Sequence, residues 1–124
     1  MTFQRPKRLP PVRSGIERVL PRVYRKHQQW VRGHSCSVPG CENRNIHFAH
    51  IKGSDEVPYE DRGGTGLKAR DTWGRPLCGI HHFEEEGHAD AFDKKYGIDR
   101  IKQARWYIDN SPHRHEWEQM ETQS

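Results

Sequence analysis

Four residues of the chain have the types and the spacing of a zinc site. Cys36 and Cys41 form a Cys-x4-Cys pair, and Cys78 and His81 form a Cys-x2-His pair. Three thiolates and one imidazole are the soft and borderline ligands that a closed tetrahedral zinc site uses. The sequence therefore predicts a structural Zn²⁺ ion bound by these four residues. His34 is the alternative to His81 as the fourth ligand.

Two more histidines flank this set without being needed by it. His50 lies between the two halves of the zinc set, and His82 directly follows its last ligand. Hydrolysis of a phosphodiester bond needs a base that activates water and a divalent cation that holds the phosphate. A neutral imidazole, with a free pKa of about 6.5, can accept a proton at pH 7. Four residues after His82, Glu86 offers an oxygen ligand suited to Mg²⁺ or Mn²⁺.

Local patterns indicate which elements position these side chains. Alternating apolar and polar residues predict a short strand over residues 45–51, which contains His50. Residues 52–70 are polar and glycine-rich, and their spacing does not match a P-loop, so a flexible loop is expected there. A short extended segment, residues 72–77, then leads to Cys78. Apolar residues at helical spacing predict helices over residues 21–32 and 100–109, and Asp99 can cap the second of these. Two short helices are expected over residues 79–86 and 90–96, ended by Gly87 and Gly97.

Some polar features carry no predicted chemistry. His47 is interpreted as a surface or supporting residue, because it alternates with Phe48 in the expected strand. The acidic run Glu84–Glu86 is, as a run, typical of a solvated helix face. Two histidines near the C-terminus, His113 and His115, are given no role.

The composition describes one small domain with a thin core. The chain has 124 residues, of which 31% are hydrophobic, so a metal ion is expected to help stabilise the fold. It contains three cysteines, all of them in the predicted zinc set, and a Cys/His mixture favours a metal site in a reducing compartment. No signal peptide or membrane span is expected, and the expected location is the cytoplasm.

Charge is concentrated at the start of the chain. Residues 1–32 contain nine Lys or Arg residues and one Glu, a net charge of +8, while the remainder carries a net charge of −4. A basic arm on a near-neutral body indicates binding to a phosphate backbone, although a solubilising tail is the alternative. The residues expected to contact nucleic acid are Arg5, Lys7, Arg8 and Arg13 in the arm, and Lys68 and Arg70 in the loop.

Taken together, these motifs resemble the HNH endonucleases, also called ββα-metal or His-Me finger nucleases. Within them, the chain is most similar to the short phage and prophage HNH nucleases related to the RecA-dependent nuclease Ref. The resemblance spans about residues 27–108. It is carried by Cys36-x4-Cys41, Ala49-His50-Ile51, Gly64-Thr-Gly66-x-Lys68, Asp71, Pro76-Leu-Cys78-x2-His81-His82 and His88.

The resemblance implies a fold and a role for each matching residue. The fold would be α+β, a small zinc-stapled ββα-metal core with flanking N- and C-terminal helices. His50 would be the general base. Asp71 would take the middle position of the HNH pattern, which orients the base or supports the metal. His82 would be a ligand of the catalytic Mg²⁺ or Mn²⁺ ion.

Two positions depart from the family pattern. The helix of this group often carries two histidines at i and i+4, whereas this chain has Glu86 at i+4 and His88 two residues later. Either side chain is a candidate for the second ligand of the catalytic ion. Ala49 stands where many HNH enzymes have an Asp or His metal ligand.

The expected organisation is a flexible basic arm (1–14), an HNH nuclease domain (15–110) and a polar C-terminal tail (111–124). The expected function is metal-dependent hydrolysis of DNA in phage or prophage DNA processing or recombination. One rival is a non-catalytic, zinc-stabilised nucleic-acid-binding module. Another is a zinc domain that binds a protein of a recombination or packaging complex.

Overall fold

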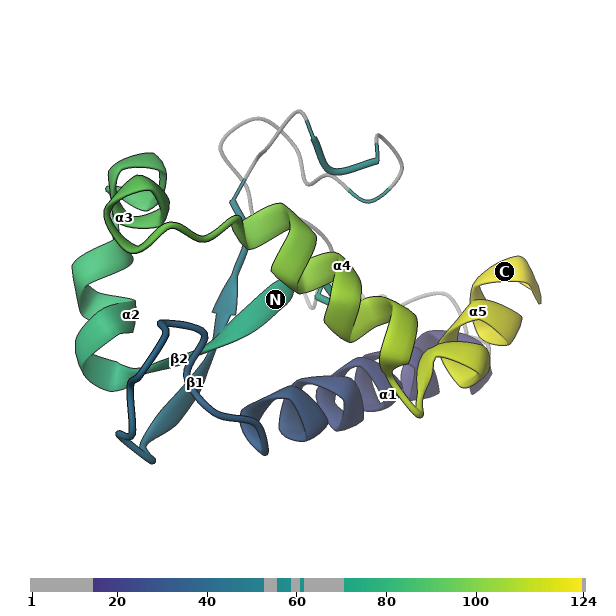
Figure 1. The fold of residues 1–124 in the computed structure, drawn as a ribbon. Helices are drawn as coiled ribbons and strands as arrows, with labels where there is room; N and C mark the ends of the chain where they lie inside the picture. Colours follow the sequence, from purple (N-terminus) through teal and green to yellow (C-terminus); the bar gives the residue numbers. More distant parts are fainter. Residues whose placement is uncertain (1–14, 53–55, 59–60, 62–70, 124) are drawn as a thin grey trace, which may run out of the picture.

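The computed structural model of the protein describes residues 15–52, 56–58, 61 and 71–123. The expected basic arm and the predicted contact residues Lys68 and Arg70 lie outside these residues. The described part is a small α+β structure, as expected (Figure 1). Its elements are α1 (Gly15–Arg32), β1 (Ile46–His50), β2 (Gly74–Cys78), α2 (Gly79–Glu85), α3 (Ala89–Tyr96), α4 (Arg100–Asn110) and α5 (Arg114–Gln123).

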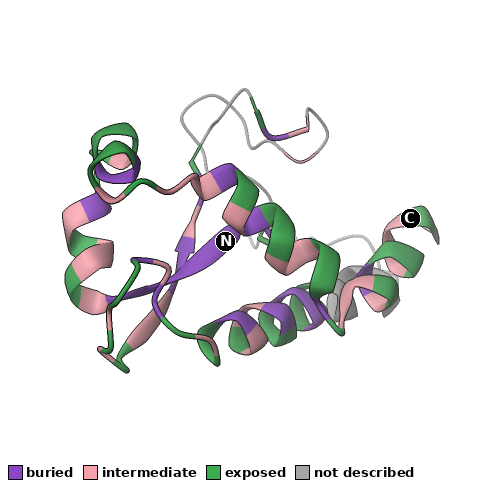
Figure 2. Cartoon of the chain, viewed as in Figure 1, coloured by how far each residue is buried: buried purple, intermediate pink, exposed green. Residues whose placement is uncertain are grey.

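The two strands form an antiparallel pair that continues directly into a helix. Ile46 pairs with Cys78, and His50 pairs with Gly74 at the opposite end. α2 begins at the residue after β2, so β1, β2 and α2 form one β–β–α unit. Helices α1 and α4 pack against this unit, and all five residues of β2 are buried (Figures 1 and 2). The predicted strand over residues 45–51 is therefore confirmed.

Gly74 allows the two strands to approach closely where β1 ends. A Cβ atom on Gly74 would lie 2.4 Å from Phe48 Cζ and 2.8 Å from the Ala49 carbonyl oxygen. Both distances are shorter than real Cβ contacts, so a larger residue would displace Phe48 or the backbone of β1. Because His50 is the last residue of β1, Gly74 contributes to its placement.

The predicted helix boundaries have the expected chemical causes. Asp99 caps α4, because its carboxylate accepts hydrogen bonds from the backbone N–H groups of Ile101 at 2.9 Å and Lys102 at 3.1 Å. Gly97 ends α3 in the left-handed conformation, with φ of 67°. α1 differs from the prediction, since it begins at Gly15 and contains Pro21 in its interior, where one helical hydrogen bond is lost.

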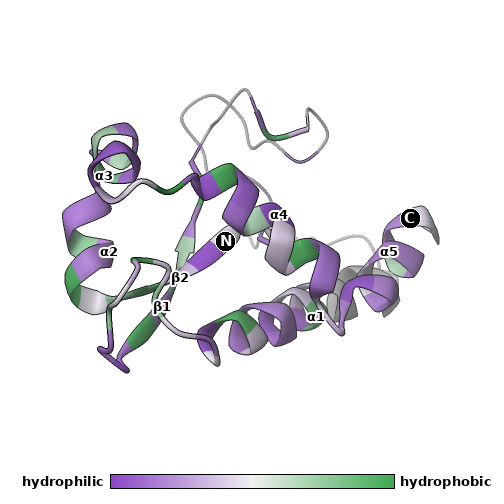
Figure 3. Ribbon diagram, in the orientation of Figure 1, coloured by the Kyte–Doolittle hydropathy of each residue, from purple (hydrophilic) through white to green (hydrophobic). Residues whose placement is uncertain are grey.

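Most of the segment expected to be a polar C-terminal tail is helical and packed. Residues 114–123 form α5, and Trp117 on this helix is buried. Its ring lies 5.0 Å from that of His27 and 6.4 Å from that of Tyr24, both on α1, and the Tyr24 hydroxyl donates to Glu121 at 2.5 Å. Hydrophilic residues dominate this helix, and its helical structure therefore depends on tertiary contact with α1 (Figure 3).

A buried arginine connects β2 to three helices. The Arg75 side chain is fully buried, and its guanidinium lies 2.8 Å from carboxylate oxygens of Glu85 on α2 and Asp93 on α3. It also donates to Gln103 Oε1 on α4 at 2.9 Å. Arg100 approaches the other oxygen of Asp93 at 3.1 Å. The two cations, Arg75 and Arg100, are therefore paired with the two buried carboxylates of Glu85 and Asp93.

Among the described residues, no helix is both long enough and apolar enough to cross a membrane.

Candidate metal centre and histidine cleft

The four predicted zinc ligands come together in space. Their ligand atoms, three sulfur atoms and one imidazole nitrogen, all lie within 4.8 Å of one another. The Cys41 and Cys78 sulfur atoms are 3.8 Å apart, and His81 Nδ1 lies 3.2 Å from Cys78 Sγ and 3.6 Å from Cys36 Sγ. The turn after α1 supplies the first two cysteines, and the junction of β2 with α2 supplies the other two ligands.

These separations fit a tetrahedral zinc ion. With Zn–S bonds of about 2.3 Å and Zn–N bonds of about 2.05 Å, tetrahedral geometry requires S···S distances of about 3.8 Å and S···N distances of about 3.6 Å. The observed contacts match these values to within a few tenths of an ångström. The cluster of Cys36, Cys41, Cys78 and His81 can thus hold a structural metal such as zinc.

The surroundings of the cluster are those of a closed site. In the metal-free protein, burial raises the pKa of the Cys36 thiol to about 11. Since a metal binds the thiolate, metal binding would release a proton there. Phe92 and Tyr96 of α3 cover the His81 ring, with centroids 6.2 Å and 5.3 Å away. His34 lies outside the cluster, because its Nδ1 atom donates to the Trp30 carbonyl oxygen at 2.9 Å.

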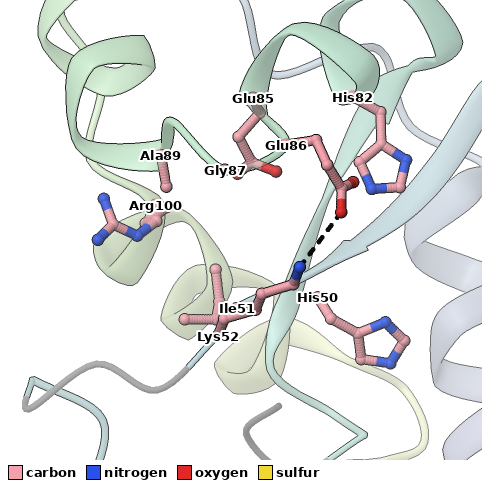
Figure 4. Close-up of a pocket in the computed structure, with 9 residues that line it drawn as sticks. All are labelled: His50, Ile51, Lys52, His82, Glu85, Glu86, Gly87, Ala89 and Arg100. Carbon is pink, nitrogen blue, oxygen red and sulfur yellow. Dashed lines mark hydrogen bonds and ion pairs between the residues drawn. The ribbon is translucent and has the colours of Figure 1, made fainter. Parts of the chain in front are cut away.

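The two histidines left over by the zinc set line the same cavity. His50, from the end of β1, and His82, from α2, line a hollow of about 330 Å³ together with Glu86 (Figure 4). Glu86 and His82 lie side by side in this view, as their i, i+4 spacing requires. We call this hollow the histidine cleft. His88 precedes α3, where its side chain is exposed.

Asp71 lies near His50. The Asp71 carboxylate oxygen is 3.7 Å from His50 Nε2, an ion pair when the imidazole is protonated. The His50 ring packs edge-on against Phe48, with a centroid distance of 4.9 Å. The Gln28 side chain of α1 donates to the Asp71 backbone carbonyl at 2.9 Å. Packing on one side and a carboxylate on the other thus limit the positions of the His50 imidazole.

His47 contacts His82, which the sequence did not suggest. The two Nδ1 atoms are 3.0 Å apart, so one imidazole donates a hydrogen bond to the other. Strand alternation explains the contact, because His47 and Phe48 point to opposite faces of β1, and Phe48 faces His27 of α1. His47 therefore faces α2. The sequence did contain one indication of this contact. Ala49 occupies the strand position at which a metal ligand was expected, and His47 lies two residues before it, on the same face of the strand.

Each member of the acidic run Glu84–Glu86 forms an ion pair, although only Glu85 is buried. Glu84 pairs with Lys95 at 2.7 Å, and Glu85 pairs with the buried Arg75 at 2.8 Å. Glu86 pairs with Lys52 at 3.2 Å across the histidine cleft (Figure 4). Lys52 and Glu86 are both well exposed, so this last pair contributes little stability and opens readily.

The chain is similar to a segment of a larger curated protein. That protein is the uncharacterized protein YdfU of Escherichia coli (strain K12), which is 35% identical over 75 residues. The aligned residues make up 60% of this chain and 19% of YdfU, so the chain spans about a fifth of the length of that relative. No protein-family model matches the chain, and no solved structure matches it.

Proposed function

We propose that the protein is a metal-dependent endonuclease of the HNH type that hydrolyses DNA phosphodiester bonds in phage or prophage DNA processing or recombination. One observation carries the proposal. His50, His82 and Glu86 all line one cleft of the β–β–α unit, His50 from the end of β1 on the strand face opposite His47, and a separate cluster able to hold structural zinc lies on the same unit. This arrangement supplies a base and hard-metal ligands at one place and a scaffold at another.

In this proposal each cleft residue has one role. His50 accepts a proton from the attacking water, and the Asp71 carboxylate 3.7 Å away stabilises the imidazolium that results. His82 and Glu86 would hold a Mg²⁺ or Mn²⁺ ion once Lys52 releases the Glu86 carboxylate. When bound, that ion would neutralise charge on the scissile phosphate and on the leaving oxygen.

His47 would hold His82 in the form that binds a cation. If His82 donates its Nδ1 proton to His47 Nδ1, the lone pair of His82 remains on Nε2 for the metal. By accepting this proton, His47 Nδ1 fixes both the tautomer and the ring orientation of His82. His47 is therefore a positioning residue in the proposal.

The solvent face of α1 supports DNA as the substrate. Arg22, Arg25 and Arg32 are exposed at helical spacing on this face, opposite the buried Val23 and His27. Cations on one face of a helix can contact successive phosphates, which gives binding that does not depend on base sequence. We call these three arginines the α1 stripe.

A second candidate function has its own supporting observation. The Glu86 carboxylate is neutralised by Lys52 at 3.2 Å, and Ala49 has no ligand atom to offer at the expected strand position. Both features suit a zinc-stabilised module that binds DNA without cleaving it. The two candidates differ in metal stoichiometry, because the binding module needs zinc alone.

Nicking of supercoiled plasmid, combined with metal analysis, tests the proposal. The zinc-loaded protein should nick plasmid with added Mg²⁺ or Mn²⁺ and should bind one Mn²⁺ ion per chain in addition to zinc. Glu86→Ala should abolish both properties, whereas His88→Ala should retain them. If the protein binds DNA but nicks plasmid with neither ion, and if zinc is the only metal it binds, the binding module is established instead.

A further inference from the structure

A second hollow, of about 480 Å³, lies between the loop after α1 and the C-terminal half of α4. Three of its seven lining residues have aromatic rings: the Tyr107 ring lies 5.0 Å from that of Trp106 and 5.1 Å from that of His34. Trp30 supports the wall, with its ring 4.6 Å from His34. We call this hollow the aromatic groove; the lining residues used below are His34, Gln103, Trp106 and Tyr107.

Trp106 presents an unusually large apolar surface to water. Its side chain is 52% exposed, although tryptophan is highly buried on average. Tyr107 meets it nearly perpendicularly, at an interplanar angle of 81°, and His34 approaches it from the opposite wall with a centroid distance of 6.4 Å. These contacts limit the motion of the indole while leaving part of it accessible. A ligand that stacks on the indole would therefore lose little entropy in ordering it.

Two exposed cations lie close in the chain to residues that line the groove. Lys102 lies one helical turn before Trp106 on α4 and is exposed. Arg32 ends α1, two residues before His34, and is also exposed. Neither cation forms an ion pair with any residue that the structure describes. Arg32 is also the last member of the α1 stripe, so the stripe leads toward the groove.

Gln103 adds a hydrogen-bond donor of fixed orientation. Its Oε1 atom accepts from the buried Arg75 guanidinium at 2.9 Å. An arginine can only donate, so this contact determines which end of the amide faces Arg75. The Nε2 group is then the part of Gln103 that can donate to an acceptor in the groove.

We propose that the aromatic groove binds an unpaired base of single-stranded DNA. The base stacks on Trp106 and accepts a hydrogen bond from Gln103, while Lys102 and Arg32 contact the flanking phosphates. Aromatic platforms bordered by cations are the general means by which proteins hold single strands. A second copy of this chain is a poorer occupant, because it would bring further cations against Lys102 and Arg32. The inference goes beyond the proposed nuclease function and shares with it only the premise that DNA is the ligand.

Fluorescence anisotropy of the full chain tests the proposal. The zinc-loaded protein is titrated, without Mg²⁺ or Mn²⁺, into a labelled oligothymidine and into a duplex of the same length. Loss of one stacked base weakens binding by about 5- to 150-fold, so Trp106→Ala should raise the Kd for the single strand by that factor. Trp106→Phe should restore most of the affinity, and the duplex Kd should change little.

Phe83→Ala is the matched control, since Phe83 is 83% exposed on α2, outside the aromatic groove. This variant should bind both DNA forms as the parent does. An unchanged single-strand Kd for Trp106→Ala overturns the proposal. An equal loss of affinity for the duplex would also overturn it. The same holds if the parent protein is a dimer that Trp106→Ala dissociates. Because the assay needs no cleavage, single-strand binding through Trp106 would stand even if the protein nicked no plasmid.

Discussion

His47 Nδ1 lies 3.0 Å from His82 Nδ1, so an imidazole of strand β1 and an imidazole of helix α2 share a hydrogen bond. The contact joins the two elements that border the histidine cleft. It also gives His82 a partner that can determine which of its ring nitrogens carries the proton.

Removing this partner should weaken the proposed cation site without unfolding the protein. Supporting partners of metal-bound histidines contribute about 10- to 100-fold to metal affinity or activity. His47→Ala should lose Mn²⁺ affinity by that factor, measured by titration calorimetry, with unchanged zinc content. His47→Gln, whose amide oxygen can accept from His82, should recover part of the loss. Equal Mn²⁺ affinity in all three proteins would show that His47 does not support the cation site.

The Cys₃His cluster should control folding through zinc. Structural zinc contributes on the order of 10 kcal/mol in sites of this kind. Purified protein should contain one zinc per chain, and Cys78→Ser should be poorly folded by circular dichroism. His34→Ala is the control, because His34 lies outside the cluster and should not affect zinc content. A folded, fully helical Cys78→Ser protein without zinc would contradict the assignment.

The buried Arg75 cluster should be sensitive to loss of its cation. Arg75→Met would leave Glu85 and Asp93 buried without their shared partner, which should lower the free energy of unfolding by about 3–5 kcal/mol. Arg114→Met removes a half-buried arginine whose pairs with Asp109 and Glu118 lie at the surface, and it should cost about 1 kcal/mol or less. Urea denaturation of the zinc-loaded proteins measures both changes. Similar losses in the two variants would show that burial of Arg75 is unimportant.

His27 should make stability depend on pH. Burial lowers the pKa of His27 to about 4, and its neutral ring donates from Nε2 to the Thr72 carbonyl at 3.1 Å and accepts from the Ser111 hydroxyl at 2.9 Å. The unfolded chain binds this proton below its ordinary pKa of 6.5, but the folded protein binds it only below about 4. Stability should therefore fall as the pH drops from 6.5 to 4, by roughly 3 kcal/mol from this residue.

His27→Gln isolates that contribution. The variant retains the other titrating groups, including the zinc ligands, so their effect is common to both proteins. Its free energy of unfolding should fall less steeply than the parent's between pH 6.5 and pH 4. Parallel pH profiles for the two proteins would rule out His27 as the cause.

Local patterns in the sequence predicted most of the fold and the metal cluster. The spacing of the cysteines and His81 identified the four residues that meet, and Asp99 and Gly97 marked real helix ends. The helix ends and each half of the cluster depend on neighbours in the chain, whereas the joining of the two halves, 37 positions apart, was inferred from the ligand chemistry of zinc. The strand ending at His50 was likewise predicted from neighbours in the chain.

The remaining features depend on tertiary contacts. Trp117 stabilises α5 only because α1 lies beside it. Arg75 is charged, and its burial follows from carboxylates that arrive from α2 and α3. His47 looked like a surface residue, because its contact with His82 spans 35 positions of the chain. Local patterns contain no information about such pairs.

The rate of plasmid nicking by His50→Ala tests the central claim most directly. The comparison uses parent, His50→Ala and His115→Ala proteins, purified in parallel and assayed under single-turnover conditions with Mn²⁺. His115 is exposed on α5 and serves as the control. A general base contributes about 10²- to 10⁴-fold, so His50→Ala should lose that much rate while zinc content, helical signal and DNA affinity persist. Nicking by His50→Ala at the parental rate would contradict the account.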